Sequence, residues 1–182
     1  MKTFGAAYAL LLAMSQGTDA WVSPSTLSKS GRMSTKLHET IKFAKYEGLG
    51  NDFILIDARS SKDPPLTPEE SAKLCHRNFS VGADGVIFAL APPEGKEDEF
   101  DFSMRIYNSD GSEPEMCGNG IRCFAAFLRD LGEDAGSYNI NTLAGTIVPV
   151  MNADGGITVD MGEAILKGAD VPTTLEPNSE FD

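Results

Sequence analysis

A cysteine in a glycine-rich segment is the strongest candidate for chemistry in this sequence. Cys117 lies in residues 116–120, and apolar residues at helical spacing follow over residues 121–131. This spacing places the thiol at a helix N-terminus, where the helix dipole and unpaired backbone N–H groups favour the thiolate. Gly118 and Gly120 leave those N–H groups open to a carboxylate. Such a thiol suits proton transfer or acyl transfer, and a buried structural cysteine beside a glycine-rich turn is an equally good interpretation of these residues alone.

The other reactive residue types do not form a second site. Cys123 lies inside the apolar run and is expected in the core. Cys75 and His76 are adjacent, but neither a C-x-x-C spacing nor further ligands accompany them, so no metal site is predicted. Residues 48–51 contain two glycines but lack the third glycine of the G-x-G-x-x-G pattern and the lysine of a phosphate-binding loop. They therefore do not predict a nucleotide site. Four aspartates lie beside glycines or at strand ends, where turn formation explains them: Asp52, Asp57, Asp84 and Asp110.

Short strands and two helices must position Cys117. Thr67, Pro68 and Glu70 form a capping box with proline at the first helical position, which predicts a helix from residue 68 to about residue 77. Alternating apolar residues at 100–106 predict a half-buried strand, and residues 86–90 predict a fully buried one. Further strands are expected at 42–46, 53–58, 138–142, 146–151 and 157–161, mostly antiparallel because their turns are tight. This pattern predicts an α+β fold in which protein surrounds the helix that follows Cys117.

Composition excludes several classes of function. The chain has 182 residues, 27 Asp and Glu against 15 Lys and Arg, and a net charge of −12. This length suits one domain preceded by a targeting segment, and the acidity argues against nucleic acid or an anionic membrane as the main partner. No run of 18 apolar residues is present, so no transmembrane helix is predicted. Three cysteines are too few for a disulfide framework.

The first forty residues read as a targeting sequence. Residues 1–20 have a positive start, an apolar run and small residues before a cleavage site after Ala20, which is typical of a secretory signal peptide. Residues 21–40 are rich in Ser and Thr, basic and poor in acids, as in organelle transit peptides. Together they resemble the bipartite presequences of algae whose plastids have additional membranes, with Trp21 as the aromatic import mark. We therefore expect a plastid location, with secretion as the alternative.

Four sequence blocks are similar to those of the diaminopimelate epimerase family. They come in the family's order and spacing, and the resemblance covers about residues 42–165, the N-terminal half of that family. The blocks are residues 46–53, 82–85, 107–113 and 116–123. We expect the N-terminal epimerase domain at 41–170 and the start of a connector to a second domain at 171–182. The resemblance implies an antiparallel, barrel-like sheet wrapped around a central helix.

The resemblance also implies a reaction and a set of residues. The family is of isomerases that interconvert LL- and meso-2,6-diaminopimelate in lysine biosynthesis without pyridoxal phosphate or another cofactor, using two cysteines on opposite faces of the α-carbon. Cys117 matches the first of these. Asn51 and Asn108 match residues that hold the substrate, and Gly118 and Asn119 match the backbone that takes its carboxylate.

Two departures from the family pattern and two alternative functions accompany this resemblance. Gly85 stands where some members carry a glutamine that touches the substrate. The half of the family that supplies the second cysteine is absent, so we expect no epimerisation by this chain alone. The expected partner is a missing C-terminal half or a second copy in a homodimer. The alternatives are a related thiol-dependent racemase similar to proline racemase and a non-catalytic domain of the same fold.

Overall fold

The computed structural model describes residues 40–163. The predicted signal peptide (1–20), the predicted connector (171–182) and all but the last residue of the transit-like segment (21–40) therefore lie outside the described residues. None of the helices in the described part is long and apolar enough to cross a membrane.

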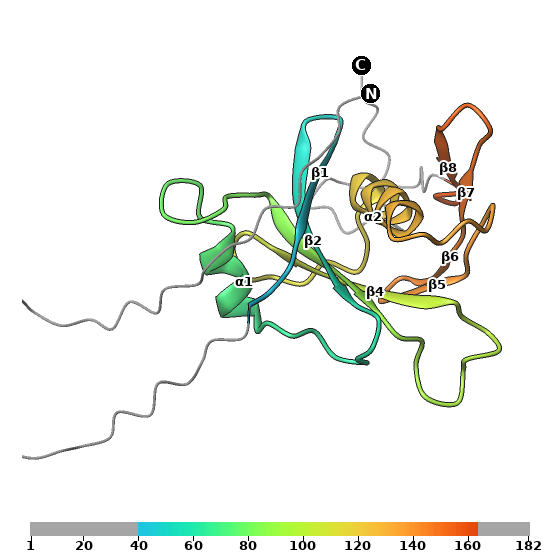
Figure 1. Cartoon of the computed structure of the whole chain (residues 1–182), viewed down its shortest axis with the longest axis horizontal. Helices are drawn as coiled ribbons and strands as arrows, with labels where there is room; N and C mark the ends of the chain where they lie inside the picture. The colour runs from blue at the N-terminus through green and yellow to red at the C-terminus, as the bar shows by residue number, and fades with distance from the viewer. Residues whose placement is uncertain (1–39, 164–182) are drawn as a thin grey trace, which may run out of the picture.

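Six strands form one sheet in the order β1-β2-β3-β4-β5-β6 (Figure 1). A second, two-stranded sheet pairs β7 with β8. The strands of the larger sheet are β1 (Ala44–Gly48), β2 (Asn51–Ala58), β3 (Gly85–Leu90), β4 (Phe102–Asn108), β5 (Ile140–Thr142) and β6 (Gly145–Ile147). The smaller sheet contains β7 (Pro149–Met151) and β8 (Ile157–Val159). The strand predicted at 146–151 is thus two strands in different sheets.

The α+β fold and the mostly antiparallel pairing are confirmed, and the large sheet also contains two parallel pairs. β1–β2, β3–β4 and β5–β6 are antiparallel, whereas β2–β3 and β4–β5 are parallel. Parallel neighbours require a crossover connection. Helix α1 (Pro68–Leu74) lies in the connection from β2 to β3, and helix α2 (Gly118–Asp130) lies in that from β4 to β5. The tight turns correctly predict antiparallel pairing, but only for the pairs that are not joined through a helix.

Helix α2 is the central helix that the sequence predicts. It contacts β1, β2 and β3 of the large sheet and both strands of the small sheet. Figure 1 shows α2 between β1 and the β7–β8 pair. Its buried residues lie on more than one face, because the helix is covered from two sides: Ile121, Cys123, Phe124, Ala125, Phe127 and Leu128.

Helix α1 covers the opposite face of the large sheet. The capping box is confirmed, since the Thr67 side chain accepts from the Glu70 N–H and the Glu70 side chain accepts from the Thr67 N–H. The helix ends at Leu74, three residues before the predicted end. Beyond Leu74, the Leu74 and Cys75 carbonyls accept hydrogen bonds from the N–H groups of Gly82 and Ala83. These bonds direct the chain back to the sheet.

Burial on both faces explains the apolar runs in β2 and β3. Alternate residues of these strands belong to two cores. The α2-side core contains Phe53, Leu55, Ile87 and Ala89, and the α1-side core contains Ile54, Ile56, Val86 and Phe88. β4 is also buried on more than the single face that a half-buried strand predicts, because Ser103 and Tyr107 are both buried. Tyr107 packs in the α1-side core with Phe88.

The β1–β2 turn has an unusual residue for its conformation. Leu49 and Gly50 form the turn with φ values of 56° and 83°, as hairpins with two-residue turns require. Leu49 is 92% exposed.

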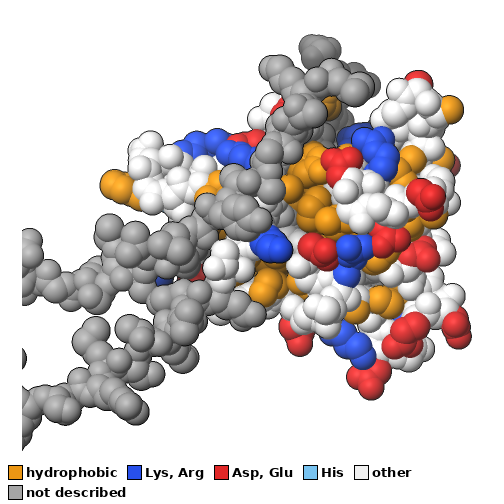
Figure 2. Space-filling model, viewed as in Figure 1, with side chains coloured by type: hydrophobic (Ala, Val, Ile, Leu, Met, Phe, Trp, Pro, Cys, Tyr) orange, Lys and Arg blue, Asp and Glu red, His pale blue; other side chains and the backbone are white. Residues whose placement is uncertain are grey.

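Over the visible face of the molecule, Figure 2 shows apolar side chains exposed among acidic and basic ones.

We expect the stability of the domain to depend on the burial of α2. Phe124→Ala removes a fully buried ring and should lower the free energy of unfolding by about 3–5 kcal/mol. Phe79→Ala is the matched control, because Phe79 is 86% exposed, and should change it by less than about 0.5 kcal/mol. Urea denaturation measures both, and similar losses in the two variants would contradict this account of the core.

Candidate active site

Three strands end or begin at the place where α2 starts. In the register of the sheet, Phe53 of β2 lies beside Gly85 of β3, which lies beside Asn108 of β4. Asn51, at the first position of β2, therefore lies at the same end of the sheet as Asn108. The segment after β4 leads to the N-terminus of α2. Strand register thus gathers residues that are far apart in the sequence.

Cys117 is the N-cap residue of α2. Its backbone is extended (φ −138°, ψ 116°), and its sulfur accepts a hydrogen bond from the Gly120 N–H at 3.4 Å. The thiol in turn donates to Asn51 Oδ1 at 3.9 Å. The first turn of α2 contains no acidic residue, so the positive end of the helix dipole is not neutralised there. The predicted position of Cys117 at a helix start is confirmed, and the structure brings Cys117 together with Asn51.

Close packing explains the glycine at position 120 of this helix start. A Cβ atom on Gly120 would lie 3.1 Å from Ile87 Cδ1 and 3.2 Å from Cys117 Cβ. A larger residue would push against the N-cap cysteine itself. A Cβ on Gly118 would meet the side chain of Met161 at 3.4 Å, and Met161 is 51% exposed. Asn119 is half-buried, and its carbonyl oxygen lies close to Gly48.

Asn108 is held by its own turn. Its side-chain amide donates to Ser112 Oγ at 3.0 Å, and its backbone N–H donates to the Ser112 carbonyl. The Asp110 carboxylate accepts from the Ser112 N–H and hydroxyl. The interpretation of Asp110 as a turn residue is confirmed, as is that of Asp57, which pairs with nearby Arg59.

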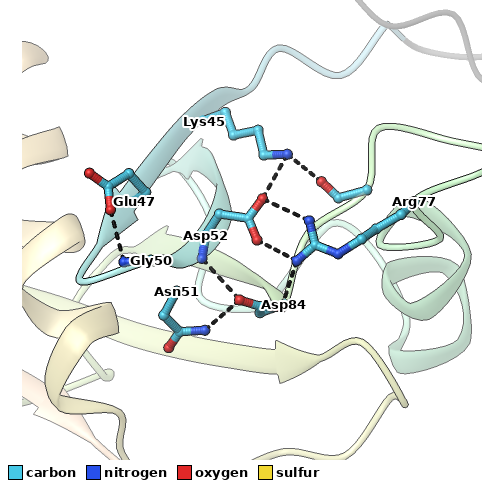
Figure 3. Close-up of polar contacts among 8 residues, drawn as sticks. Lys45, Glu47, Gly50, Asn51, Asp52, Arg77 and Asp84 are labelled. Atoms are coloured by element: carbon cyan, nitrogen blue, oxygen red, sulfur yellow. Dashed lines mark hydrogen bonds and ion pairs between the residues drawn. The ribbon is translucent and has the colours of Figure 1, made fainter.

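Asp52 and Asp84 are not merely turn residues, and that interpretation is wrong for both. Asp84 Oδ2 accepts from the Asn51 amide at 2.7 Å and from the Asp52 N–H at 3.0 Å (Figure 3). The Arg77 guanidinium bridges the Asp84 and Asp52 carboxylates at 2.7 Å and 2.6 Å, and the Lys45 ammonium pairs with Asp52 at 2.8 Å. No local spacing could predict this cluster, since its partners are mostly 25 or more residues apart.

Hydrogen bonds and charges keep both carboxylates ionised. The Asn51 amide is the main cause of a lowered pKa for Asp84, followed by the Asp52 N–H. The pKa of Asp52 is lowered chiefly by the Arg77 guanidinium, with Lys45 contributing in the same direction. Because both groups accept several hydrogen bonds as anions, they act as fixed acceptors beside Asn51.

Gly85 cannot carry a larger side chain in this backbone. Its Cβ would lie 2.9 Å from the Tyr107 carbonyl oxygen, which belongs to the neighbouring strand. A glutamine at this position would therefore require β3 and β4 to separate.

The remaining thiols are structural. Cys123 and Cys75 are both buried, and burial is the main cause of raising the pKa of each to about 11. The expectation that Cys123 is a core residue is confirmed. Among residues 40–163, no group of His, Cys, Asp and Glu is arranged to hold a metal ion.

Sequence comparison decides the family. The diaminopimelate epimerase family model matches residues 43–167. The chain belongs to the diaminopimelate epimerase family. A diaminopimelate epimerase of Synechococcus elongatus is 61% identical over 137 residues, which cover 75% of this chain and 48% of that protein. The chloroplastic diaminopimelate epimerase of rice (Oryza sativa subsp. japonica) is 57% identical over 137 residues, which cover 74% of this chain and 38% of that protein.

The chain spans about half the length of the diaminopimelate epimerases that it matches. The same holds for that of Synechocystis sp., which is 58% identical over 141 residues and is covered to 49%. Among solved structures, a Bacillus anthracis phenazine biosynthesis protein of the PhzF family aligns with a TM-score of 0.49 and 26% identity, covering 66% of this chain and 40% of that one.

We expect selective alkylation of Cys117. At about pH 8, iodoacetamide should modify Cys117 in the folded protein, while Cys75 and Cys123 stay protonated and buried and react at least about tenfold more slowly. Peptide mass spectrometry measures each site. In urea all three thiols should react alike, which is the control, and fast labelling of Cys123 in the folded protein would contradict its assignment to the core.

Proposed function

We propose that this chain contributes one half of the active site of a diaminopimelate epimerase, with Cys117 as one of its two acid/base thiols. The observation that carries the proposal is the Cys117 thiol at the start of α2, in contact with Asn51 and Gly120, in a chain of this family. Asn51 and Asn108 are proposed to hold the substrate, and the backbone of Gly118 and Asn119 to take its carboxylate.

The chemistry begins with the weak acidity of the α-hydrogen. As a thiolate, Cys117 removes this proton, and the electron pair of the C–H bond moves into the substrate carboxylate. The unpaired N–H groups at the start of α2 stabilise the charge that develops there. This arrangement needs no electron-withdrawing cofactor, because the helix start supplies directed dipoles where the charge appears.

Inversion needs a second proton donor on the opposite face of the α-carbon. The other two cysteines of the described part cannot serve, since both are buried in the core. We propose that the second thiol comes from a part of the functional enzyme outside residues 40–163. The homodimer expected from the sequence stays a prediction.

We further propose a plastid location and a role in lysine biosynthesis. The rice relative that matches this chain is named as chloroplastic. The composition of residues 1–40 supports import through a bipartite presequence.

Affinity labelling tests substrate recognition. An aziridine analogue of diaminopimelate should alkylate Cys117, because ring opening by a thiolate requires that the analogue be held at the helix start. Diaminopimelate should protect Cys117 from the analogue, whereas proline should not. Cys117→Ser is the control for the labelled site. Protection by proline instead would favour the racemase alternative, and labelling that neither amino acid reduces would contradict a substrate pocket.

Hydrogen exchange tests the role of Cys117. In D2O the protein should incorporate deuterium at the α-carbon of LL-diaminopimelate, since a single base suffices for exchange. Cys117→Ser should reduce the rate by at least about 100-fold, while Cys75→Ser should leave it unchanged because Cys75 lies in the α1-side core. Mass spectrometry of the amino acid measures both. Undiminished exchange by Cys117→Ser would remove Cys117 from the mechanism.

A further inference from the structure

We propose that Asp84 is a positioning residue that fixes the orientation of the Asn51 amide and thereby the group that faces the Cys117 thiol. The inference deepens the proposed function, because it concerns the thiol assigned there as acid and base. Asp84 acts through Asn51 and has no proposed contact with the substrate.

The orientation follows from the chemistry of the two side chains. An asparagine amide presents a donor on one side and an acceptor on the other, and its neighbours decide which way it faces. An ionised carboxylate can only accept hydrogen bonds. Since Asp84 Oδ2 lies 2.7 Å from Asn51 Nδ2, the amide nitrogen must face Asp84. The amide oxygen then faces Cys117, which is where the thiol donates at 3.9 Å.

Asp84 is itself held from several directions. Its second carboxylate oxygen accepts from Arg77, which also binds Asp52 (Figure 3). Its backbone N–H donates to the Asp52 carbonyl at 2.9 Å, and its carbonyl accepts from the Ser109 N–H at 2.9 Å. The backbone bonds fix the position of Asp84, and its carboxylate cannot turn away from Asn51 without breaking its contacts with Arg77 and the Asp52 N–H.

The consequence is a balance at the sulfur of Cys117. The Gly120 N–H donates to this sulfur, whereas Asn51 Oδ1 accepts from its S–H group. If the amide turned over, Asn51 would present N–H instead, and both neighbours would donate to the sulfur. Asp84 prevents this, so the sulfur keeps one hydrogen-bond donor and one acceptor beside it.

A double-variant cycle tests the proposal. The rate of Cys117 alkylation by iodoacetamide is measured at one pH, without substrate, for Asn51→Ala, Asp84→Ala and the combination. Each single variant removes the fixed acceptor and should raise the rate about two- to tenfold. The combination should match Asn51→Ala within about twofold, because Asp84 acts only through Asn51. Asp57→Ala is the matched control, since Asp57 also pairs with an arginine but lies at the other end of β2.

Two outcomes would overturn the proposal. Additive effects of the two substitutions would show that Asp84 influences Cys117 without Asn51, and an unchanged rate in Asp84→Ala would show no influence at all. Circular dichroism establishes that each variant is folded. If Asp84→Ala is not, Asp84→Leu carries the test: its apolar side chain of similar shape offers no acceptor to the Asn51 amide, so the rate should again rise, whereas an unchanged rate overturns the proposal.

The cycle is independent of the proposed reaction. An additive cycle together with protection of Cys117 by diaminopimelate would remove only the role of Asp84. A non-additive cycle together with failed protection would remove only the proposed substrate.

Discussion

Helix α2 lies between two sheets, and its burial is the packing interaction on which the candidate site depends. Its first turn contains Gly118 and Gly120, each about 1 kcal/mol less favourable in a helix than alanine. Farther along, Ile121, Phe124 and Leu128 are fully buried, and each contributes about 1.5–3 kcal/mol through removal of apolar surface from water. The buried part of the helix thus outweighs its weak start. The first turn can therefore consist of residues that are poor helix formers. Cys117 is its N-cap, and Gly120 packs closely against Ile87.

The large sheet also brings distant segments of the chain together, at the end of the sheet where α2 starts. Because β2 and β3 run parallel and are aligned with β4, the segments that carry Asn51, Asp84 and Asn108 come together although they are far apart in the chain. Gly85 permits the strands to approach closely at this point. Charges that would repel one another, Asp52 and Asp84, are joined by Arg77 and Lys45, so the cluster is compensated.

Local features were predictable from the sequence, and long-range ones were not. The capping box at Thr67, the buried β3 run and the position of Cys117 at a helix start depend on residues within a few positions of one another. The parallel pairing of β2 with β3 depends on a crossover whose direction no local turn indicates. Asp84 stands beside Gly85 and resembles a turn residue, because its partners Asn51 and Asp52 lie more than thirty positions away. The resemblance to the family supplied Asn51, which residue spacing alone would not have placed beside Cys117. It also supplied Asn108, which strand register places at the same end of the sheet.

The first turn of α2 contains no acidic residue, and this would couple folding of the domain to the binding of an anion at the helix start. Many helices carry Asp or Glu there and thereby neutralise the positive end of the dipole; α2 has a cysteine cap and two glycines instead. An anion bound at this position would add the negative charge that the first turn lacks, so it would stabilise the helix and, through the helix, both sheets that pack on it. If the proposed substrate carboxylate binds there, its binding and the folding of the domain are thermodynamically coupled.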